Sequence, residues 1–272
     1  LRQLTDTDWR VLIGGRRILA GVQLGFREST ITATVLEVMD ASERVVRFSQ
    51  PVNNLLTELG EMPLPPYIHT RLEDDERYQT VYSEQEGSAA APPAGLHFTS
   101  ELLESLQAKG VHLAYCTLHV GLDTFQPVKV DDVEAHHIHS ERAILDAGNA
   151  AIINSARAAD KRIIAVGTTS ARTLETAGIL AAGGDPANAI DAPMPDPNQP
   201  VIAFSADTQL YIYPGYQWRV VDAMITNFHL PRSTLLMMLS ALVGRERLLQ
   251  TYEIAKQESY RFYSFGDAMF IR

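Results

Sequence analysis

The feature that most constrains the fold is an alternation of apolar, β-type runs with helical patterns in the second half of the chain. Residues 111–120 and 162–166 are runs of the first kind, whereas residues 143–159 and 169–182 show helical periodicity. Strands that alternate with helices favour an α/β arrangement, because each helix leads the chain back across the sheet to the next strand. The sequence therefore predicts an α/β layer with largely parallel strands.

The remaining patterns extend this domain and place a β-rich region before it. Further helices are expected at 100–109, 233–242 and 245–259, and further strands at 208–213, 217–225 and 268–271. Before residue 60 the pattern predicts strands at 9–13, 30–39 and 44–49 and a short helix at 52–59. Pro63, Pro65 and Pro66 fix φ and remove backbone donors, so an extended connector is expected there.

These patterns divide the chain into two expected domains. One covers residues 1–65 and the other residues 66–272, and the pattern leaves the boundary open up to about residue 90. Residues 183–200 combine prolines, glycines and aspartates without periodicity, which is typical of a surface excursion.

Composition excludes several classes of protein. Hydrophobic residues make up 46% and charged residues 21%, which supports a globular core, and no apolar run is long enough for a membrane helix. The single cysteine, Cys116, excludes an internal disulfide and a multi-cysteine zinc site. The formal charge of −10 argues against binding RNA mainly by neutralising phosphates. An RNA substrate would need a local basic patch or one extruded base.

One candidate ligand site is the segment VGTTSARTLE at 166–175, where a β-branched run meets glycine, three hydroxyl residues and a helical pattern. Gly167 permits a tight turn, and free N–H groups at a helix start attract anions. Arg172 could hold an anion with two hydrogen bonds. Plain N-capping by the hydroxyls, without any ligand, explains the same pattern.

A second candidate is HHIHSE at 136–141, with three histidines and a glutamate. A zinc site would need further ligands, and HExxH is absent. General acid–base chemistry or substrate binding is the other functional interpretation, and a polar loop whose histidines bind backbone is the structural one.

The segment ITNFHLPRST at 225–234 is a third candidate. Asn227 and His229 alternate on one side of an extended run, and Pro231 ends that run before the next helix. α/β enzymes bind ligands where a strand end meets a helix. A histidine satisfied inside the core is the alternative.

Three shorter signals complete the set of candidates. His97 and His119 each lie near a glycine at the boundary of an expected element. The segment RFYSFGDAM at 261–269 is aromatic and carries Asp267. Its rings are typical either of a core or of a surface that stacks a nucleobase.

Taken together, the motifs make the chain similar to the S-adenosylmethionine:tRNA ribosyltransferase-isomerase family of queuosine biosynthesis. The matching segments occur in family order from about residue 60 onwards: GEMPLPPYI (60–68), RYQTVYSEQEGSAAAPPAGLHFT (77–99), TLHVGLDTFQPVKV (117–130), HHIHSE (136–141), AVGTTSARTLE (165–175), IYPGY (212–216), ITNFHLPRSTLLMMLSAL (225–242) and YRFYSFGDAMFI (260–271). The resemblance implies an α/β plus β fold, an α/β/α layered domain with a smaller β-barrel-like domain formed by the first 60 or so residues.

The sequence departs from the family pattern at three places. That pattern normally begins upstream of what corresponds to Leu1, with a segment that belongs partly to the α/β domain, and this puts full activity in doubt. Asp123 stands where the family usually has glycine, and Pro93 where it usually has threonine. These two substitutions bear only on local loop geometry.

The resemblance implies a reaction and its partners. The ribosyl unit of S-adenosylmethionine is transferred to 7-aminomethyl-7-deazaguanine in a tRNA anticodon and isomerised, so that adenine and methionine leave and epoxyqueuosine-tRNA forms. S-adenosylmethionine is then a co-substrate, no metal is expected, and the enzyme is expected to be a cytoplasmic monomer that does not bind membranes.

This chemistry assigns hypothetical roles to residues. The sulfonium acidifies the C5′ protons, so a general base is needed, with His229 as first choice and His139 as second. His97, Asn227 or Asp267 could assist the departure of adenine. The candidates for substrate binding are Gly167, Thr168, Thr169, Ser170 and Arg172 for the methionine carboxylate, Phe98, Phe228, Tyr263 and Asp267 for the deazaguanine, and His119 and Glu141.

Two other functions remain open at this stage. A methyltransferase would use the same co-substrate, although a GxGxxG run after the first strand is absent. A truncated relative that binds RNA or cofactor without catalysis is the second. Free adenine among the products supports ribosyl transfer, whereas S-adenosylhomocysteine supports methyl transfer.

Overall fold

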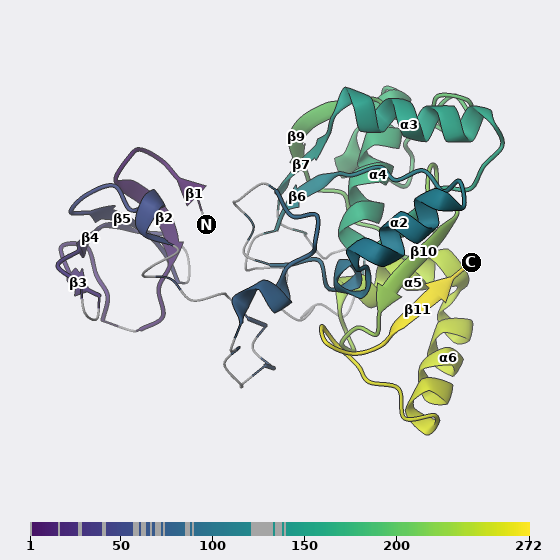
Figure 1. The fold of residues 1–272 in the computed structure, drawn as a ribbon. Coiled ribbons are helices and arrows are strands. Elements are labelled where there is room, and N and C mark those ends of the chain that lie inside the picture. The colour runs from purple at the N-terminus through teal and green to yellow at the C-terminus, as the bar shows by residue number, and fades with distance from the viewer. Residues whose placement is uncertain are drawn as a thin grey trace. The chain divides into compact units, whose positions relative to one another are not determined.

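The computed structural model describes most of the chain and divides it into two compact units, Leu1–Pro66 and Tyr67–Arg272 (Figure 1). The described residues are 2–15, 17–26, 29–39, 42–56, 60, 64–65, 67–68, 72, 74–84, 88, 90–120, 133, 138 and 140–272. His136, His137 and His139 lie outside them. Within the described residues the structure is mixed α/β and contains three sheets.

The first unit is a five-stranded antiparallel sheet. Its strands are β1 (Arg2–Gln3), β2 (Asp8–Leu12), β3 (Gln23–Gly25), β4 (Thr32–Val38) and β5 (Glu43–Phe48), in the order β1-β2-β5-β4-β3. Alternate residues of β4 point inwards, so Ala33 and Val35 meet Val46 of β5 in a small core. A bulge between Val35 and Glu37 bends the sheet, but no pairing of β1 with β3 closes it within the described residues.

The second unit contains two three-stranded sheets. One has the order β6-β7-β9, from Thr117–His119, Glu141–Leu145 and Phe204–Thr208, and both of its pairings are antiparallel. The other has the order β11-β10-β8, from Ala268–Ile271, Ala223–Asn227 and Ile164–Val166. Only β8 and β10 run parallel among the described strands. The expectation of largely parallel strands was therefore wrong.

Five α-helices are described in this unit: α2 (Ser100–Ala108), α3 (Ala147–Ala158), α4 (Thr168–Ala181), α5 (Thr234–Val243) and α6 (Arg245–Gln257). Polar side chains start three of them, because Thr99, Asp146 and Ser233 each accept a backbone N–H from the first turn. Among the described residues, no helix has the length and apolar character of a membrane-spanning segment.

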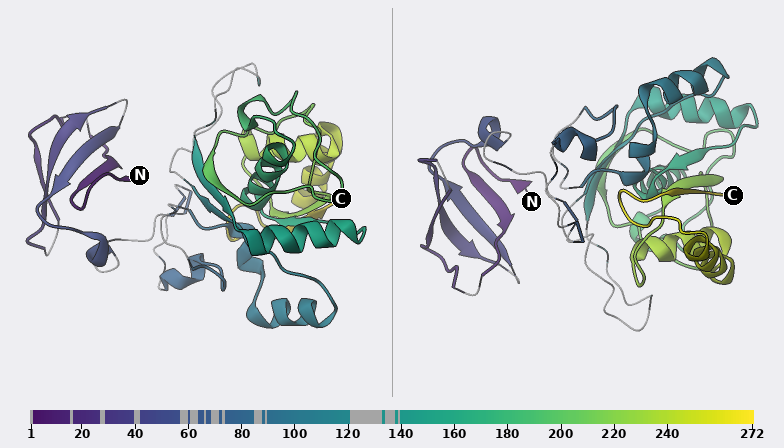
Figure 2. Two further views of the ribbon diagram at one scale, coloured as in Figure 1. Left: turned by 90° about the horizontal axis from the view of Figure 1, so that it is seen from above. Right: turned by 60° about the horizontal axis from the view of Figure 1, so that its bottom comes forward.

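Helix α4 is the centre of the unit. It packs against strands of both sheets, and its residues from Ala171 to Ile179 are buried. Figures 1 and 2 show α3 and the α5–α6 pair on opposite sides of this unit, with α4 inside. The main core joins Ala171, Leu174 and Ala177 of α4 to Leu145 of β7 and Met224 of β10.

Short 3-10 helices complete the described structure. They are η1 (Asn53–Leu55), η2 (Asp75–Tyr78), η3 (Pro93–His97) and η6 (Pro186–Asn188). η1 replaces the first part of the helix expected at 52–59, and residues 57–59 lie outside the described range. η3 matters for function because it packs against β10 and brings His97 to the end of that strand.

Candidate functional site

The candidate site is built where the parallel strands β8 and β10 end side by side. Ile225 pairs with Val166, and the backbone N–H of Gly167 donates to the carbonyl of Ile225 at 2.8 Å. η3 lies beside Gly167, because the Cβ of Ala94 is 3.6 Å from the position that a Cβ on Gly167 would take. Ligands in α/β structures bind at this carboxyl edge of a sheet, so we call it the carboxyl edge.

The start of α4 forms one wall of the carboxyl edge. Gly167 has φ +90°, a value that suits glycine, and it is the N-cap without a side-chain hydrogen bond. The hydroxyl of Ser170 donates to the carbonyl of Val166 at 2.8 Å, so it fastens the helix start to β8. The first-turn amides of Thr168 and Thr169 have no intrahelical acceptor and favour an anion.

Asn227 ends β10 and holds the loop that precedes β11. Its Nδ2 donates to the carbonyls of Tyr263 and Ser264, at 3.0 and 3.3 Å. The N–H of Tyr263 donates to the carbonyl of Phe228 at 3.0 Å. These carbonyls fix the orientation of the amide, whose Oδ1 is buried and has no hydrogen-bond partner among the described residues. The loop is thus tied to the carboxyl edge, and one acceptor is left over.

His229 follows two residues later with its ring partly buried. Its Nε2 lies 2.8 Å from Oγ1 of Thr226, and its backbone N–H donates to the hydroxyl of Tyr252 at 2.8 Å. Burial lowers the pKa of His229 to about 4. The imidazole is therefore neutral at pH 7 and can accept a proton, although burial also weakens it as a base.

His97 and Asp267 meet at the exposed side of this edge. The main cause that lowers the pKa of Asp267 is its hydrogen bond from Arg261, and the nearby His97 contributes to the lowering. Nη2 of Arg261 donates to Oδ1 of Asp267 at 2.7 Å. Asp267 is therefore a carboxylate at neutral pH, able to accept hydrogen bonds but not to give a proton.

The aromatic candidates differ in exposure. Phe228 is buried and its ring packs against those of Tyr252 and Phe262, at centroid distances of 5.3 and 4.8 Å. Tyr263 is exposed, and Phe98, the residue after η3, is partly buried. Among these three, Tyr263 offers the most accessible ring face to a base.

Three further candidates form a separate group between α4 and the sheet β6-β7-β9. The buried Arg172 pairs with the buried Glu141 and donates Nε to the carbonyl of Leu210 at 2.9 Å. Burial lowers the pKa of Arg172, and Glu141 opposes that shift. His119 lies on β6, and its Nδ1 is buried without a partner among the described residues. Arg172 thus fastens α4 to the sheet β6-β7-β9.

The structure brings together most of the predicted residues and adds some that sequence reasoning missed. The carboxyl edge carries Gly167, Thr168, Thr169, Ser170, Asn227, Phe228, His229, Tyr263, Asp267, His97 and Phe98. His139 lies outside the described residues. Thr226, Tyr67 and Ser264 were not predicted. Tyr67 and Ser264 lie within quoted motifs, but their contact spans 197 residues of sequence and leaves no local signal.

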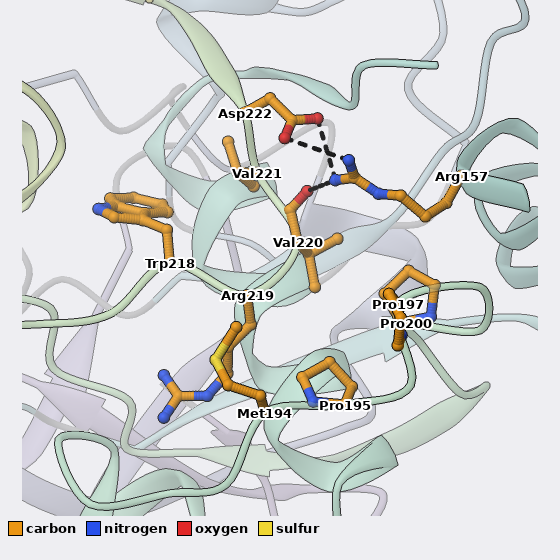
Figure 3. A pocket seen from close by; sticks show the side chains of 10 residues that line it. All are labelled: Arg157, Met194, Pro195, Pro197, Pro200, Trp218, Arg219, Val220, Val221 and Asp222. Atoms are coloured by element: carbon orange, nitrogen blue, oxygen red, sulfur yellow. Dashed lines mark hydrogen bonds and ion pairs between the residues drawn. The ribbon is translucent and has the colours of Figure 1, made fainter. Parts of the chain in front are cut away.

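A measurable pocket lies at the other edge of the same sheet, where β8 and β10 begin (Figure 3). It has a volume of about 200 Å³ and is lined by Arg157, Met194, Pro195, Pro197, Pro200, Trp218, Arg219, Val220, Val221 and Asp222. Arg157 donates to the carbonyl of Val220 at 2.6 Å and pairs with Asp222 at 2.9 Å. No predicted site residue lines it. Its charged groups are paired within the chain, as are Arg261 and Asp267 at the carboxyl edge.

Comparisons with known proteins agree on one family. A family model described as queuosine biosynthesis protein matches residues 1–271. The crystal structure of an S-adenosylmethionine tRNA ribosyltransferase from Thermotoga maritima is similar, with 30% sequence identity. The match covers 100% of the present chain and 73% of that chain, with a TM-score of 0.49.

Proposed function

The chain belongs to the queuosine biosynthesis protein family, and from this premise we propose that it is an S-adenosylmethionine:tRNA ribosyltransferase-isomerase. It transfers the ribosyl unit of S-adenosylmethionine to 7-aminomethyl-7-deazaguanine in tRNA and isomerises it, giving epoxyqueuosine-tRNA, adenine and methionine. The observation that carries the proposal is the carboxyl edge, where a helix start, a neutral imidazole, a spare amide oxygen and an exposed tyrosine meet.

His229 is the proposed base for the C5′ proton. The sulfonium stabilises the carbanion character that develops when this proton leaves. If Nε2 carries the imidazole proton, it donates to Thr226, and the lone pair of Nδ1 is the proton acceptor. Thr226 then acts as a positioning residue. The lowered pKa keeps the ring unprotonated beside a cationic substrate. His139 remains the second candidate.

The departure of adenine needs a proton or a hydrogen bond on its ring. Asp267 is charged and can only accept, so His97 is the proposed proton donor in this pair. The Oδ1 of Asn227, which has no partner among the described residues, is proposed to accept a hydrogen bond from an amino group of the substrate. The first-turn amides of Thr168, Thr169 and Ser170, behind Gly167, are proposed to bind the methionine carboxylate.

The remaining candidates have supporting roles in this proposal. Arg172 and Glu141 form a buried ion pair, and we propose that they hold α4 in position. Phe228 packs beneath the carboxyl edge, whereas Tyr263 and Phe98 are available to the deazaguanine. His119 stays a substrate-binding candidate because its Nδ1 has no partner within the described part of the chain.

The finer architecture and cellular context are part of the same proposal. We propose that residues 66–272 form an α/β/α layered domain and residues 1–65 a β-barrel-like domain. The bulge in β4 and the antiparallel strand order β1-β2-β5-β4-β3 support the β-barrel-like domain. A tRNA substrate places the enzyme in the cytoplasm. We further propose that it acts as a monomer with tRNA and S-adenosylmethionine as its partners and without a metal.

Product analysis tests the function directly. The chain is incubated with S-adenosylmethionine and an anticodon stem-loop that carries 7-aminomethyl-7-deazaguanine, and the RNA mass and small products are measured. We expect the RNA to gain the ribosyl-derived unit while adenine and methionine appear in equal amounts. S-adenosylhomocysteine with a methylated RNA would replace the proposal by methyl transfer. Binding of both substrates without turnover would identify a non-catalytic relative.

A further inference from the structure

Two aromatic rings beside the carboxyl edge are exposed, whereas Phe228 and Tyr78 close to them are buried. Tyr263 and Phe265 have exposed fractions of 36% and 41%, whereas Ser264 between them is buried. We call these two rings the ring pair. The exposed part of each ring remains in contact with water, so two such rings next to a candidate site point to a partner that covers them.

The ring pair is braced from behind. The ring of Tyr67 lies 4.9 Å from that of Tyr263, and the ring of Tyr78 lies 5.4 Å from that of Phe265. The hydroxyls of Tyr67 and Tyr78 both hydrogen-bond Oγ of Ser264, at 2.7 and 3.2 Å. One buried hydroxyl thus links both supporting rings, and each exposed ring keeps a fixed orientation before any ligand binds.

The backbone of Tyr263 adopts a strained conformation, which is consistent with a fixed orientation of its ring. Its φ is +72°, a value that costs free energy for a residue with a Cβ atom. Asn227 holds the carbonyl of Tyr263, and Phe228 accepts its N–H. The surrounding contacts therefore keep a conformation that the residue alone would avoid, and the ring stays exposed beside the candidate site.

The charge of the chain indicates what the ring pair can bind. With a formal charge of −10, the chain has limited means to hold RNA by neutralising phosphates. The neighbouring Arg261 is already paired with Asp267. Stacking on aromatic rings does not depend on net charge and accepts every base.

We propose that the ring pair is a stacking platform for two adjacent bases of the RNA loop, the reacting deazaguanine on Tyr263 and its neighbour on Phe265. The proposal rests on the proposed function and adds Phe265 as a substrate-binding residue. Tyr67, Tyr78 and Ser264 are positioning residues, because they act through the rings that they support.

Equilibrium binding tests the platform separately from catalysis. The anticodon stem-loop carries fluorescent 2-aminopurine next to the modified base, and stacking quenches its emission. We expect quenching by the wild-type chain. Phe265→Ala should weaken binding by about 5-fold to 150-fold, which corresponds to ~1–3 kcal/mol per stacked base. The KM for S-adenosylmethionine and the salt dependence of binding should not change.

A matched control is Phe270→Ala, which removes a ring that is 51% exposed on β11 outside the ring pair. It should bind RNA like the wild type. If Phe265→Ala and Phe270→Ala both match the wild type, the platform is overturned. If both weaken binding equally, the effect belongs to the general surface, and the platform is again overturned.

The positioning role has its own readout. Ser264→Ala removes both tyrosine hydrogen bonds but leaves every ring in place, so quenching should fall while the KM for S-adenosylmethionine stays constant. Ser264→Thr restores the hydroxyl and should recover the quenching. Equal quenching in Ser264→Ala and the wild type, with both folded by circular dichroism, would refute the bracing.

The outcomes for platform and function are distinguishable. A wild-type chain that quenches, loses quenching in Phe265→Ala and forms no product supports the platform and refutes the ribosyl transfer. A chain that converts the RNA equally well with and without Phe265 refutes the platform alone. A wild-type chain that neither binds nor quenches the RNA refutes both.

Discussion

The two edges of the sheet β11-β10-β8 differ in the polar groups that they present. At the edge where β8 and β10 begin, charged groups are paired within the chain. Asp222 binds Arg157 and the N–H of Ile163, and Arg219 donates to backbone carbonyls, among them that of Pro193 at 3.1 Å. At the carboxyl edge, Asn227 keeps a buried oxygen without a partner among the described residues.

Residues other than glycine with positive φ occur near both edges. Asp160 lies just before β8, and Arg232 and Tyr263 lie near the carboxyl edge. Each edge also holds one buried polar atom without a partner among the described residues, the indole N–H of Trp218 at one edge and Oδ1 of Asn227 at the other. The carboxyl edge differs because it also carries a neutral imidazole and a helix N-terminus without a side-chain cap.

The largest predicted effect concerns the edge where the strands begin. The buried Glu175 accepts the N–H groups of Arg219, Val220 and Val221 and the hydroxyl of Tyr216, at distances from 2.7 to 2.9 Å. Glu175→Leu leaves these four donors unsatisfied, so the free energy of unfolding should fall by about 3–5 kcal/mol in urea titrations. Glu253→Leu, which removes an exposed ion pair with Lys256, is the control and should change little. If Glu175→Leu is as stable as the wild type, the hydrogen bonds that Glu175 accepts do not stabilise this edge.

A smaller effect concerns pH and the carboxyl edge. The pKa of His229 is about 4 in the fold and ordinarily 6.5, so between these values the unfolded chain binds more protons. The contribution of His229 to the free energy of unfolding is complete above pH 6.5. As the pH falls towards 4, roughly 2–3 kcal/mol of this free energy is lost. Urea titrations of the wild type and His229→Gln across this window should differ by that amount.

The control for the pH effect is His112→Gln at an exposed position. It should follow the pH dependence of the wild type. A His229→Gln curve parallel to that of the wild type throughout the window would mean that the imidazole of His229 titrates alike in the folded and unfolded chains.

The smallest predicted effect concerns the start of α4. A Cβ on Gly167 would lie 3.5 Å from Oγ1 of Thr169, so space is available, but φ +90° disfavours any other residue. Gly167→Ala should therefore cost about 1–2 kcal/mol of stability. Gly25→Ala in β3, where φ is not positive and no atom lies within 4 Å of the added Cβ, should be neutral or stabilising. Thermal unfolding of both variants measures the difference, and equal shifts would contradict the strained corner.

Sequence alone predicted those elements whose ends carry local signals. Ser233 before α5 and the strand Ala268–Ile271 were found within one residue. β7 was missed, and its residues from Ala143 on were assigned to a helix that begins only at Ala147. The local pattern around Glu141 did not indicate a strand, because the burial of this glutamate depends on its ion pair with Arg172, far along the chain.

Distant contacts also explain the other errors. The strand expected at 217–225 begins at Ala223, because the N–H groups of 219–221 donate to Glu175 and not to a neighbouring strand. The motif residues Gly167, Asn227 and His229 were recognised as site candidates from local spacing. Their convergence, and the bracing of Tyr263 by Tyr67, depend on tertiary contacts that no local pattern contains.

Single-turnover release of adenine from S-adenosylmethionine, with the precursor stem-loop present, tests most directly whether the chemistry lies at the carboxyl edge. His229→Ala removes the proposed base, and Met194→Arg fills the mouth of the pocket at the other edge. We expect a rate at least ~100-fold slower for His229→Ala and a near wild-type rate for Met194→Arg. A near wild-type rate for His229→Ala together with loss of release in Met194→Arg would contradict it.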